Sequence, residues 1–430
     1  MTLALLALVF IQAPATDSAQ LHAVATGIVQ ADNARYFEAV LRFYGDSAML
    51  LPPGEPPVSG RRAIRPRYEA LFKAFNPAIN GEVDEIRVEG RQAWVRGRNG
   101  GWLRGINGPD RALHDVYLML LRREADSVWR IQRLMWNSVS PFPVLIRSTA
   151  DGSLQPSFLS LPDSLDKARP TALMVALHSW SSDYTQRYLS METGARTRGW
   201  LLIAPNFRGR NDHAEACGSK LAEQDVLDAV QWVRDRYPID PKRIYVLGIS
   251  GGGHMTMLMA AKHPDLWAAA SAWVGLSDVA VWYGDHATDT YGAMMRRCFG
   301  GAPSSSDSVA AEFRARSPVT WLARAASLPI DFAAGRDDPE VPMVHSVRGF
   351  NALAAAAGGT PVTEAEIAEL ARPGGLLSQP TPGDTAADST WGRRIFLRRR
   401  AGPSRLTIFE GVHEWLPPAV LQWLDGHVKP

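Results

Sequence analysis

The chain has 430 residues, which is more than one ordinary hydrophobic core accommodates, so its length predicts two domains. Hydrophobic residues make up 46% of the chain and charged residues 21%, the balance of a soluble globular protein. The formal charge of +2 gives no argument for a nucleic-acid partner. No internal repeat and no metal-ligand spacing stands out, so we expect neither a repeat architecture nor a bound metal or cofactor.

The first residues, MTLALLALVFIQAPATDSAQ, contain an apolar run of about ten residues followed by Ala13-Pro14-Ala15. A signal peptidase can cut this small-x-small pattern, and the run is too short to span a membrane. We therefore expect residues 1–19 to be a signal peptide and the protein to be secreted or periplasmic. Because no Lys or Arg lies near Met1, a buried first helix is the alternative.

Residues 20–138 predict a separate α+β domain, because helical patterns come first and strand patterns follow. Apolar residues at three- and four-residue steps predict helices over residues 20–50, and a further helix starts near Arg61 after a Pro-rich loop. Short apolar runs separated by Gly and Asn turns then predict strands at Ile86 to Val88, Ala93 to Gly97, Asp115 to Leu121 and Trp129 to Met135.

Two stretches of this domain, FYGDSAMLLPPGEPPVSGRRAIRPRYEALF and WRIQRLMWNS, resemble the SnoaL-like and ketosteroid-isomerase-like cone fold. The resemblance implies a curved sheet wrapped round a pocket. No Asp or Glu can be assigned from spacing as an isomerase base, so we interpret the domain as an accessory, for homodimer formation or for holding a small apolar ligand. The candidates to line the pocket, with ordinary core or surface positions as the alternative, are Asp32, Tyr36, His114, Asp115 and Trp136.

Residues 139–170 are richer in Pro and Ser than the segments around them. We interpret them as a linker and entry hairpin. A catalytic domain is expected over residues 171–430.

In that domain, one serine lies among four glycines between a strand pattern and a helix pattern. The run RIYVLGI before Ser250 predicts a buried strand, and GGHMTMLMAAKHP after it predicts a helix that Pro264 ends. With Gly248-x-Ser250-x-Gly252 at the turn, this is the pattern of a nucleophile elbow. A Gly-rich structural turn is the alternative, and partner residues are needed to decide between the two.

A serine nucleophile needs a histidine base and a carboxylate, which follow it in α/β-hydrolases in the order Asp or Glu, then His. Predicted strands end just before Asp338 and just before His413, where an open α/β sheet places its ligands. Asp338 is our candidate acid, with Asp337 as the alternative, and His413 is the candidate base. Packed or capping roles are expected for the other histidines considered, His254, His263 and His345.

The tetrahedral intermediate of acyl transfer also needs two N–H donors directed at its oxyanion. The backbone N–H of Gly251, which follows the nucleophile, is expected to supply one. The loop after the predicted strand Thr171 to Leu177 is expected to supply the other, from the backbone of Trp180 or Ser179. An ordinary strand-end turn is the alternative.

Three further features leave their roles open. Cys217 and Cys298 are the only cysteines, and in an exported protein such a pair predicts a disulfide. Residues 206–219 and 351–404 are the two long loops, and both are lid candidates. The basic run RRIFLRRR, which ends at Arg400, predicts a solvated hairpin, with anion binding as the alternative.

From about Pro141 to the C-terminus, the chain resembles the prolyl oligopeptidase-type catalytic domain of the α/β-hydrolases. The resemblance is carried by LHSW, PNFRG, RIYVLGISGGGHM, GRDDPEVP and FEGVHEW, in family order. It implies Ser250 as nucleophile, Asp338 as orienting acid and His413 as base. HSW stands where relatives often carry a histidine followed by glycines, so the resemblance leaves the second oxyanion donor open.

We therefore expect an exported serine hydrolase that acts on a small ester or a short peptide through an acyl-enzyme on Ser250. Ester cleavage is slightly favoured, because no specificity pocket or charged clamp for a peptide terminus can be identified. Four tryptophans are candidates for flat walls near the site: Trp180, Trp273, Trp282 and Trp321. A serine-type peptidase of the same family is the alternative, followed by a ligand-binding protein with a degenerate hydrolase domain.

Overall fold

The computed structural model describes residues 17–108, 111–138, 142–166 and 168–430. It divides the chain into two compact units, Met1–Ser140 and Pro141–Pro430. Residues 1–16 of the predicted signal peptide lie outside the described residues, and its last three residues, 17–19, belong to the first helix. No helix in the four described ranges is long and apolar enough to cross a membrane.

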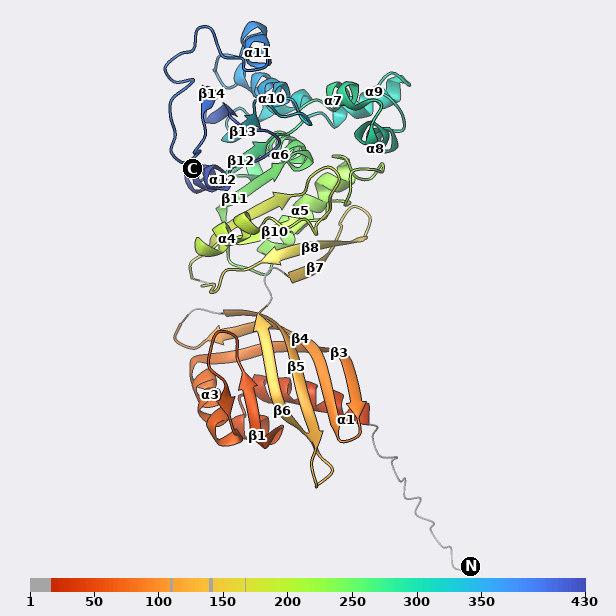
Figure 1. Ribbon diagram of the computed structural model, residues 1–430, viewed down its shortest axis with the longest axis vertical. Helices are drawn as coiled ribbons and strands as arrows, with labels where there is room; N and C mark the ends of the chain where they lie inside the picture. Colours follow the sequence, from red (N-terminus) through yellow and green to blue (C-terminus); the bar gives the residue numbers. More distant parts are fainter. Residues whose placement is uncertain (1–16, 109–110, 139–141, 167) are drawn as a thin grey trace, which may run out of the picture. The chain divides into compact units, whose positions relative to one another are not determined.

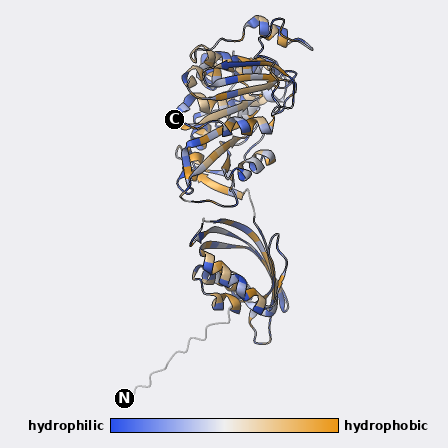
Figure 2. Ribbon diagram, turned by 90° about the vertical axis from the view of Figure 1, so that its left-hand side faces the viewer, coloured by the Kyte–Doolittle hydropathy of each residue, from blue (hydrophilic) through white to orange (hydrophobic). Residues whose placement is uncertain are grey.

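The N-terminal unit is an α+β structure in which one mixed sheet curves round helices (Figure 2). The order of the strands in the sheet is β2 (Val58–Ser59), β1 (Tyr44–Leu51), β6 (Trp129–Ser138), β5 (Arg111–Arg123), β4 (Gln92–Gly105) and β3 (Phe75–Glu89). Only β1 and β6 are parallel neighbours. The helices are α1 (Asp17–Asn33), α2 (Phe37–Arg42) and α3 (Arg61–Ala74).

The core of this unit lies between the helices and the sheet. Helix α1 contributes Leu21, Val24 and Ile28, which are spaced at three and four residues and therefore share one face. Helix α3 begins at Arg61, as predicted. The prediction of a helix that reaches residue 50 is wrong, because residues 44–51 form strand β1. Pairing with β6 decides this conformation, and Ala48 and Leu50 are buried in alternation with less buried neighbours.

The C-terminal unit is built on a nine-stranded, mostly parallel sheet (Figure 1), and the predicted α/β-hydrolase fold is confirmed. The strand order is β14 (Ile395–Ala401), β15 (Ser404–Phe409), β13 (Ile330–Gly335), β12 (Ala269–Trp273), β11 (Ile239–Ile249), β9 (Thr171–Leu177), β10 (Leu201–Pro205), β8 (Leu154–Ser160) and β7 (Phe142–Arg147). The strands from β15 to β10 are parallel, and β14, β8 and β7 are antiparallel at the edges.

Residues 142–160 form the predicted hairpin, but this hairpin belongs to the sheet and is not a separate linker. Strand β8 pairs with β10 through Leu159 and Ile203, and β7 pairs with β8 through Phe142 and Leu159. Phe142 and Leu159 are both buried, so their apolar side chains fix the hairpin on the sheet. The division between the two units falls after Ser140 in the chain, so the hairpin is part of the C-terminal unit.

The helices of this unit lie between the strands in the chain, except α12, which follows the last strand. They are α4 (Leu189–Thr197), α5 (Lys220–Arg234), α6 (Gly251–Lys262), α7 (Val279–His286), α8 (Thr290–Phe299), α9 (Asp307–Ala315), α10 (Val344–Ala354), α11 (Glu364–Leu370) and α12 (Pro417–Asp425), with short 3-10 turns at Pro264–Leu266, Pro318–Thr320 and Leu322–Ala325. Figure 1 shows α7, α8 and α9 gathered beside the sheet. The lid candidate 351–404 contains α11 and β14, so it is not a single irregular loop.

The other lid candidate, residues 206–219, is anchored to its surroundings. Cys217 forms a disulfide with Cys298 of α8, with the two Cα atoms 6.2 Å apart. The buried Arg208 donates to Asp225 of α5 at 2.7 Å and to Asp151 at 2.7 Å. A covalent bond and ion pairs therefore hold this segment against two helices and the β7–β8 turn.

Candidate active site

Ser250 lies in the turn between β11 and α6, and its backbone conformation is strained. Its φ is 59° and its ψ is −122°, values that residues with a side chain rarely adopt. Its N–H donates to the carbonyl of Trp273 on the neighbouring strand at 2.9 Å. This strand, sharp turn and helix form the elbow that exposes a serine hydroxyl above the end of a parallel sheet.

Two glycines allow the chain to approach itself closely at this elbow. A Cβ atom on Gly248 would lie 2.4 Å from the carbonyl carbon of Gly252, closer than real side chains come. A Cβ atom on Gly251 would lie 2.3 Å from the backbone nitrogen of Trp180. The missing side chain of Gly251 therefore brings the loop after β9 into contact with the residue after the serine.

This contact places two backbone N–H groups beside each other at the elbow. The N–H of Gly251 is at the N-terminus of α6, where helix N–H groups lack intrahelical acceptors and the helix dipole favours negative charge. The N–H of Trp180 donates to no acceptor within the part of the chain that the structure describes. The N–H of Ser179, the alternative donor, is used by the side chain of Gln186 at 2.7 Å. Trp180 is therefore better suited than Ser179 to bind an oxyanion.

Asp338 and His413 follow adjacent parallel strands, β13 and β15, which pair at their ends through Gly335 and Phe409. Nδ1 of His413 donates to Oδ2 of Asp338 at 2.8 Å. The other oxygen of Asp338 accepts the N–H groups of Glu340 and Val341 at 2.9 and 3.0 Å. The Asp338 side chain is fully buried, so these three hydrogen bonds fix its carboxylate toward the imidazole.

The alternative acid, Asp337, points elsewhere. Its carboxylate forms two hydrogen bonds with Arg336, at 3.0 and 2.8 Å, and its side chain is 49% exposed. The structure therefore brings His413 to Asp338.

The second imidazole nitrogen of His413 faces a carboxylate that sequence reasoning missed. Oε2 of Glu340 lies 3.6 Å from Nε2 of His413 and accepts the Tyr291 hydroxyl at 3.4 Å. Burial lowers the pKa of His413, but the hydrogen bond and charge of Asp338 and the charge of Glu340 outweigh it, so the pKa lies above its ordinary value. Glu340 is visible in the GRDDPEVP motif, but nothing in the sequence shows where its side chain points.

Ser250 and His413 are not hydrogen-bonded to each other in the described structure. Their contact in series with Asp338 stays a prediction. Catalytic hydrogen bonds are often long without substrate and tighten in the reacting complex.

The other histidines considered are placed as packing or capping groups. Nε2 of the buried His254 lies 2.7 Å from the carbonyl of Arg316, and burial lowers the pKa of His254 to about 4. Burial also lowers the pKa of His345 to about 4, and His263 is the C-cap residue of α6. No cluster of three His, Cys, Asp or Glu side chains in the described ranges is arranged to hold a metal ion.

The predicted tryptophan walls require a correction. Trp180, Trp273 and Trp282 are each at most 1% exposed, because their rings pack in the hydrophobic core. They cannot present a flat surface to a substrate. Trp321 is only partly buried, and its ring faces Lys262 and Arg324.

The pocket candidates of the N-terminal unit differ in burial and in their contacts. Asp32 is in the interior, where burial raises its pKa to about 7, whereas Tyr36 is 52% exposed and cannot line an internal pocket. Asp115 accepts the hydroxyl of Ser138 at 2.8 Å, and the other two candidates, His114 and Trp136, are on β5 and β6. A cavity of about 460 Å³ in this unit is lined by residues that include Trp94, Leu120 and Arg133, and by none of the five candidates.

Comparison with known proteins agrees with this geometry. Residues 180–367 match the model of the prolyl oligopeptidase family, a range that contains Ser250 and Asp338. Acylamino-acid-releasing enzyme 1 of Oryza sativa subsp. japonica is 28% identical over 219 residues, which is 46% of this chain and 27% of that protein. Feruloyl esterase B of Neurospora crassa is 33% identical over 129 residues, 27% of this chain and 42% of that protein. The chain thus spans less than half the length of either relative.

The N-terminal part is similar to a solved ketosteroid isomerase-like protein from Erwinia carotovora atroseptica SCRI1043. The two are 26% identical, with a TM-score of 0.27, and the match covers 29% of this chain and 96% of that one. For the C-terminal unit, the matched family and the relatives named as an esterase and an acylamino-acid-releasing enzyme support a serine hydrolase. Residues 180–367 of this unit therefore form a domain of the prolyl oligopeptidase family.

Proposed function

We propose that this protein hydrolyses small acyl esters through an acyl-enzyme on Ser250. The observation that carries the proposal is the hydrogen bond between His413 and the buried carboxylate of Asp338 at the strand ends beside the serine elbow. Asp338 fixes the tautomer that leaves Nε2 of His413 unprotonated, which is the form able to accept the serine proton.

In the first half of the reaction, Oγ of Ser250 bonds to the ester carbonyl carbon while its proton passes to Nε2 of His413. The carbonyl oxygen becomes an oxyanion, which the N–H groups of Gly251 and Trp180 stabilise. When this intermediate collapses, the carbon–oxygen bond to the leaving alcohol breaks and His413 returns the proton to that alcohol. In the second half, water bonds to the acyl carbon while His413 accepts a proton from it. The bond between that carbon and Oγ of Ser250 then breaks, His413 returns the proton to Oγ, and the carboxylic acid leaves.

Ester cleavage is favoured because an alcohol leaves with less help from the general acid than an amine does. Feruloyl and acetylxylan esterases among the relatives are consistent with this choice. Peptide cleavage is the second candidate, and one observation favours it: the half-exposed carboxylate of Glu340 beside His413 could bind the ammonium group of a peptide. The relatives named as acylamino-acid-releasing enzymes agree with that alternative.

We also propose that the protein is secreted or periplasmic. The disulfide between Cys217 and Cys298 supports export, because disulfides persist mainly in oxidising compartments. N-terminal sequencing of protein recovered from the periplasm and medium tests this: a mature chain that lacks the apolar run and starts near residue 20 is expected, and an uncleaved cytosolic chain would contradict it. For the N-terminal unit we propose an accessory role, either as a dimer contact or as a holder of a small apolar ligand. Exposed apolar side chains on its sheet, Val116 and Leu120, support a contact surface.

The decisive experiment compares the wild-type protein with Ser250→Ala. We expect a fluorophosphonate to label the wild type but not the variant, and kcat on short acyl esters to fall by about 10³-fold or more. Ser304→Ala, a change at an exposed serine, is the matched control and should keep both properties. Near-normal hydrolysis by Ser250→Ala would contradict the mechanism, and an unlabelled, inactive wild type would favour a degenerate binding protein.

The same preparation decides between esters and peptides. The measurement is kcat/KM on short acyl esters and on proline-containing peptide amides, after allowance for the greater intrinsic reactivity of esters. If the amides are the better substrates on that basis, the peptidase alternative replaces the esterase proposal.

A further inference from the structure

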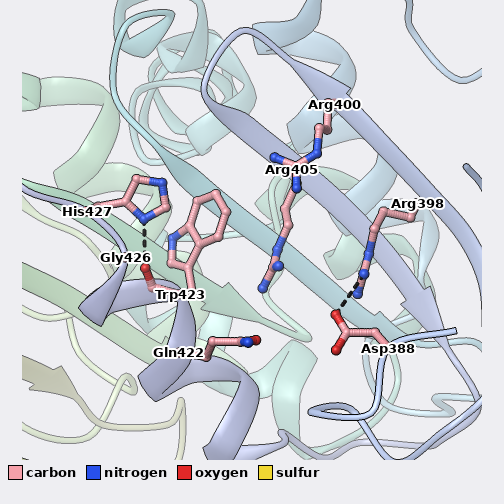
Figure 3. Close-up of a pocket in the computed structure, with 8 residues that line it drawn as sticks. All are labelled: Asp388, Arg398, Arg400, Arg405, Gln422, Trp423, Gly426 and His427. Atoms are coloured by element: carbon pink, nitrogen blue, oxygen red, sulfur yellow. Dashed lines mark hydrogen bonds and ion pairs between the residues drawn. The ribbon is translucent and has the colours of Figure 1, made fainter. Parts of the chain in front are cut away.

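A cavity of about 330 Å³ lies near the start of β15, at the opposite end of that strand from His413 (Figure 3). One side is formed by the β14–β15 hairpin, and the other by the C-terminal end of α12. The hairpin contributes three arginines to it, Arg398, Arg400 and Arg405. The basic run of the sequence therefore builds part of a cavity rather than only a solvated surface.

The strand register explains why these arginines gather. Arg398 and Arg400 are two positions apart on β14, so their side chains leave the same face of the sheet. Arg405 of β15 lies directly across from Arg400 in the antiparallel pairing and shares that face. Arg399, between the first two, pairs with Asp384 and Glu366.

The charges of the three arginines are only partly balanced. Arg405 is buried and forms two hydrogen bonds with Asp331, at 2.7 and 3.3 Å. Arg398 donates through Nη1 to Asp388 at 2.9 Å, the contact drawn in Figure 3. The exposed Arg400 forms no ion pair with any carboxylate in the described ranges. Three cations thus face two anions.

Unused hydrogen-bond donors accompany this excess charge. Nη2 of Arg398 is buried and has no hydrogen-bond partner, although a buried donor without an acceptor costs free energy. Burial lowers the pKa of Arg398, and the like charge of Arg405 adds to that effect. The amide of Gln422 and the imidazole of His427 also line the cavity. A negatively charged group bound in the cavity would reduce the repulsion between the arginines and could accept hydrogen bonds from the groups that line it.

We propose that this cavity binds a small molecule through an oxyanion group, a phosphate or a carboxylate. Arg400 supplies a guanidinium with two parallel donors, the geometry that carboxylates and phosphates bind best, and Arg398 adds a second positive charge to the lining of the cavity. The inference is independent of the proposed esterase function, because no residue of the cavity belongs to the Ser250 site.

The test is a calorimetric titration of the full chain with inorganic phosphate and, in a separate arm, with succinate, at constant ionic strength adjusted with sodium chloride. We expect saturable binding of at least one of these anions at one site. Arg400→Gln should weaken that binding by about tenfold or more, since a hydrogen bond to a charged group is lost. Arg400→Lys keeps the charge without the paired donors and should fall between the wild type and Arg400→Gln.

The control is Arg372→Gln, which removes the same charge from an exposed position just after α11. It should bind as the wild type does, and circular dichroism should show that all variants are folded. The arm that binds identifies the oxyanion as phosphate or carboxylate. No saturable binding of either anion, or an equal affinity in Arg400→Gln and the wild type, would overturn the proposal.

Discussion

The contact between Gly251 and Trp180 predicts that adding one methyl group will remove most of the activity. In Gly251→Ala, the new Cβ would lie 2.3 Å from the Trp180 nitrogen, whereas ordinary contacts begin near 3.4 Å. The elbow and the loop after β9 must therefore separate by about 1 Å, and misplacement of that size can cost about 10²-fold in rate. Loss of one oxyanion donor alone costs about 10² to 10³-fold in kcat. We therefore expect kcat on a short acyl ester to fall by at least about 10²-fold.

The matched control is Gly284→Ala in α7, where a Cβ would meet no atom within 4 Å. It should keep its activity and gain slightly in thermal stability, since alanine favours a helix over glycine by about 1 kcal/mol. Steady-state kinetics and thermal unfolding of both variants separate catalysis from folding. If Gly251→Ala is folded and retains kcat within about twofold of the wild type, the two N–H groups do not form the oxyanion site.

Two further predictions concern the catalytic base and the disulfide. His413 must lose its proton to act as the base, and the negative charge of Glu340 raises the pKa of His413. Glu340→Gln should therefore move the acid limb of the pH profile of kcat/KM to lower pH. An acid limb at the same pH as in the wild type would show that Glu340 does not act on the base. The double variant Cys217→Ser/Cys298→Ser removes a disulfide that joins residues with a sequence separation of 81. Its free energy of unfolding, measured with urea, should be lower than that of the wild type by up to about 4.5 kcal/mol. An unchanged unfolding midpoint would contradict that expectation.

Sequence reasoning succeeded where the evidence was local. The strand from Thr171 to Leu177 is buried along nearly its whole length in a parallel sheet, so it appears in the sequence as one continuous apolar run. The glycines around Ser250 identify the elbow because only a residue without a side chain fits where the chain contacts itself. Asp338 and His413 could be chosen because each follows a recognisable strand, and the end of a strand in such a sheet is where side chains meet.

The tertiary structure decided what depends on segments far apart in the chain. Residues 44–51 look helical by spacing, yet pairing with β6 makes them a strand. Three of the four tryptophans proposed as walls, Trp180, Trp273 and Trp282, are buried, because segments from elsewhere in the chain cover them. The approach of Glu340 to His413 depends on how two loops pack, and the common face of Arg400 and Arg405 depends on the hairpin register. In each case the residue type is local information, but its neighbours and exposure are set by packing and register, which a single sequence does not specify.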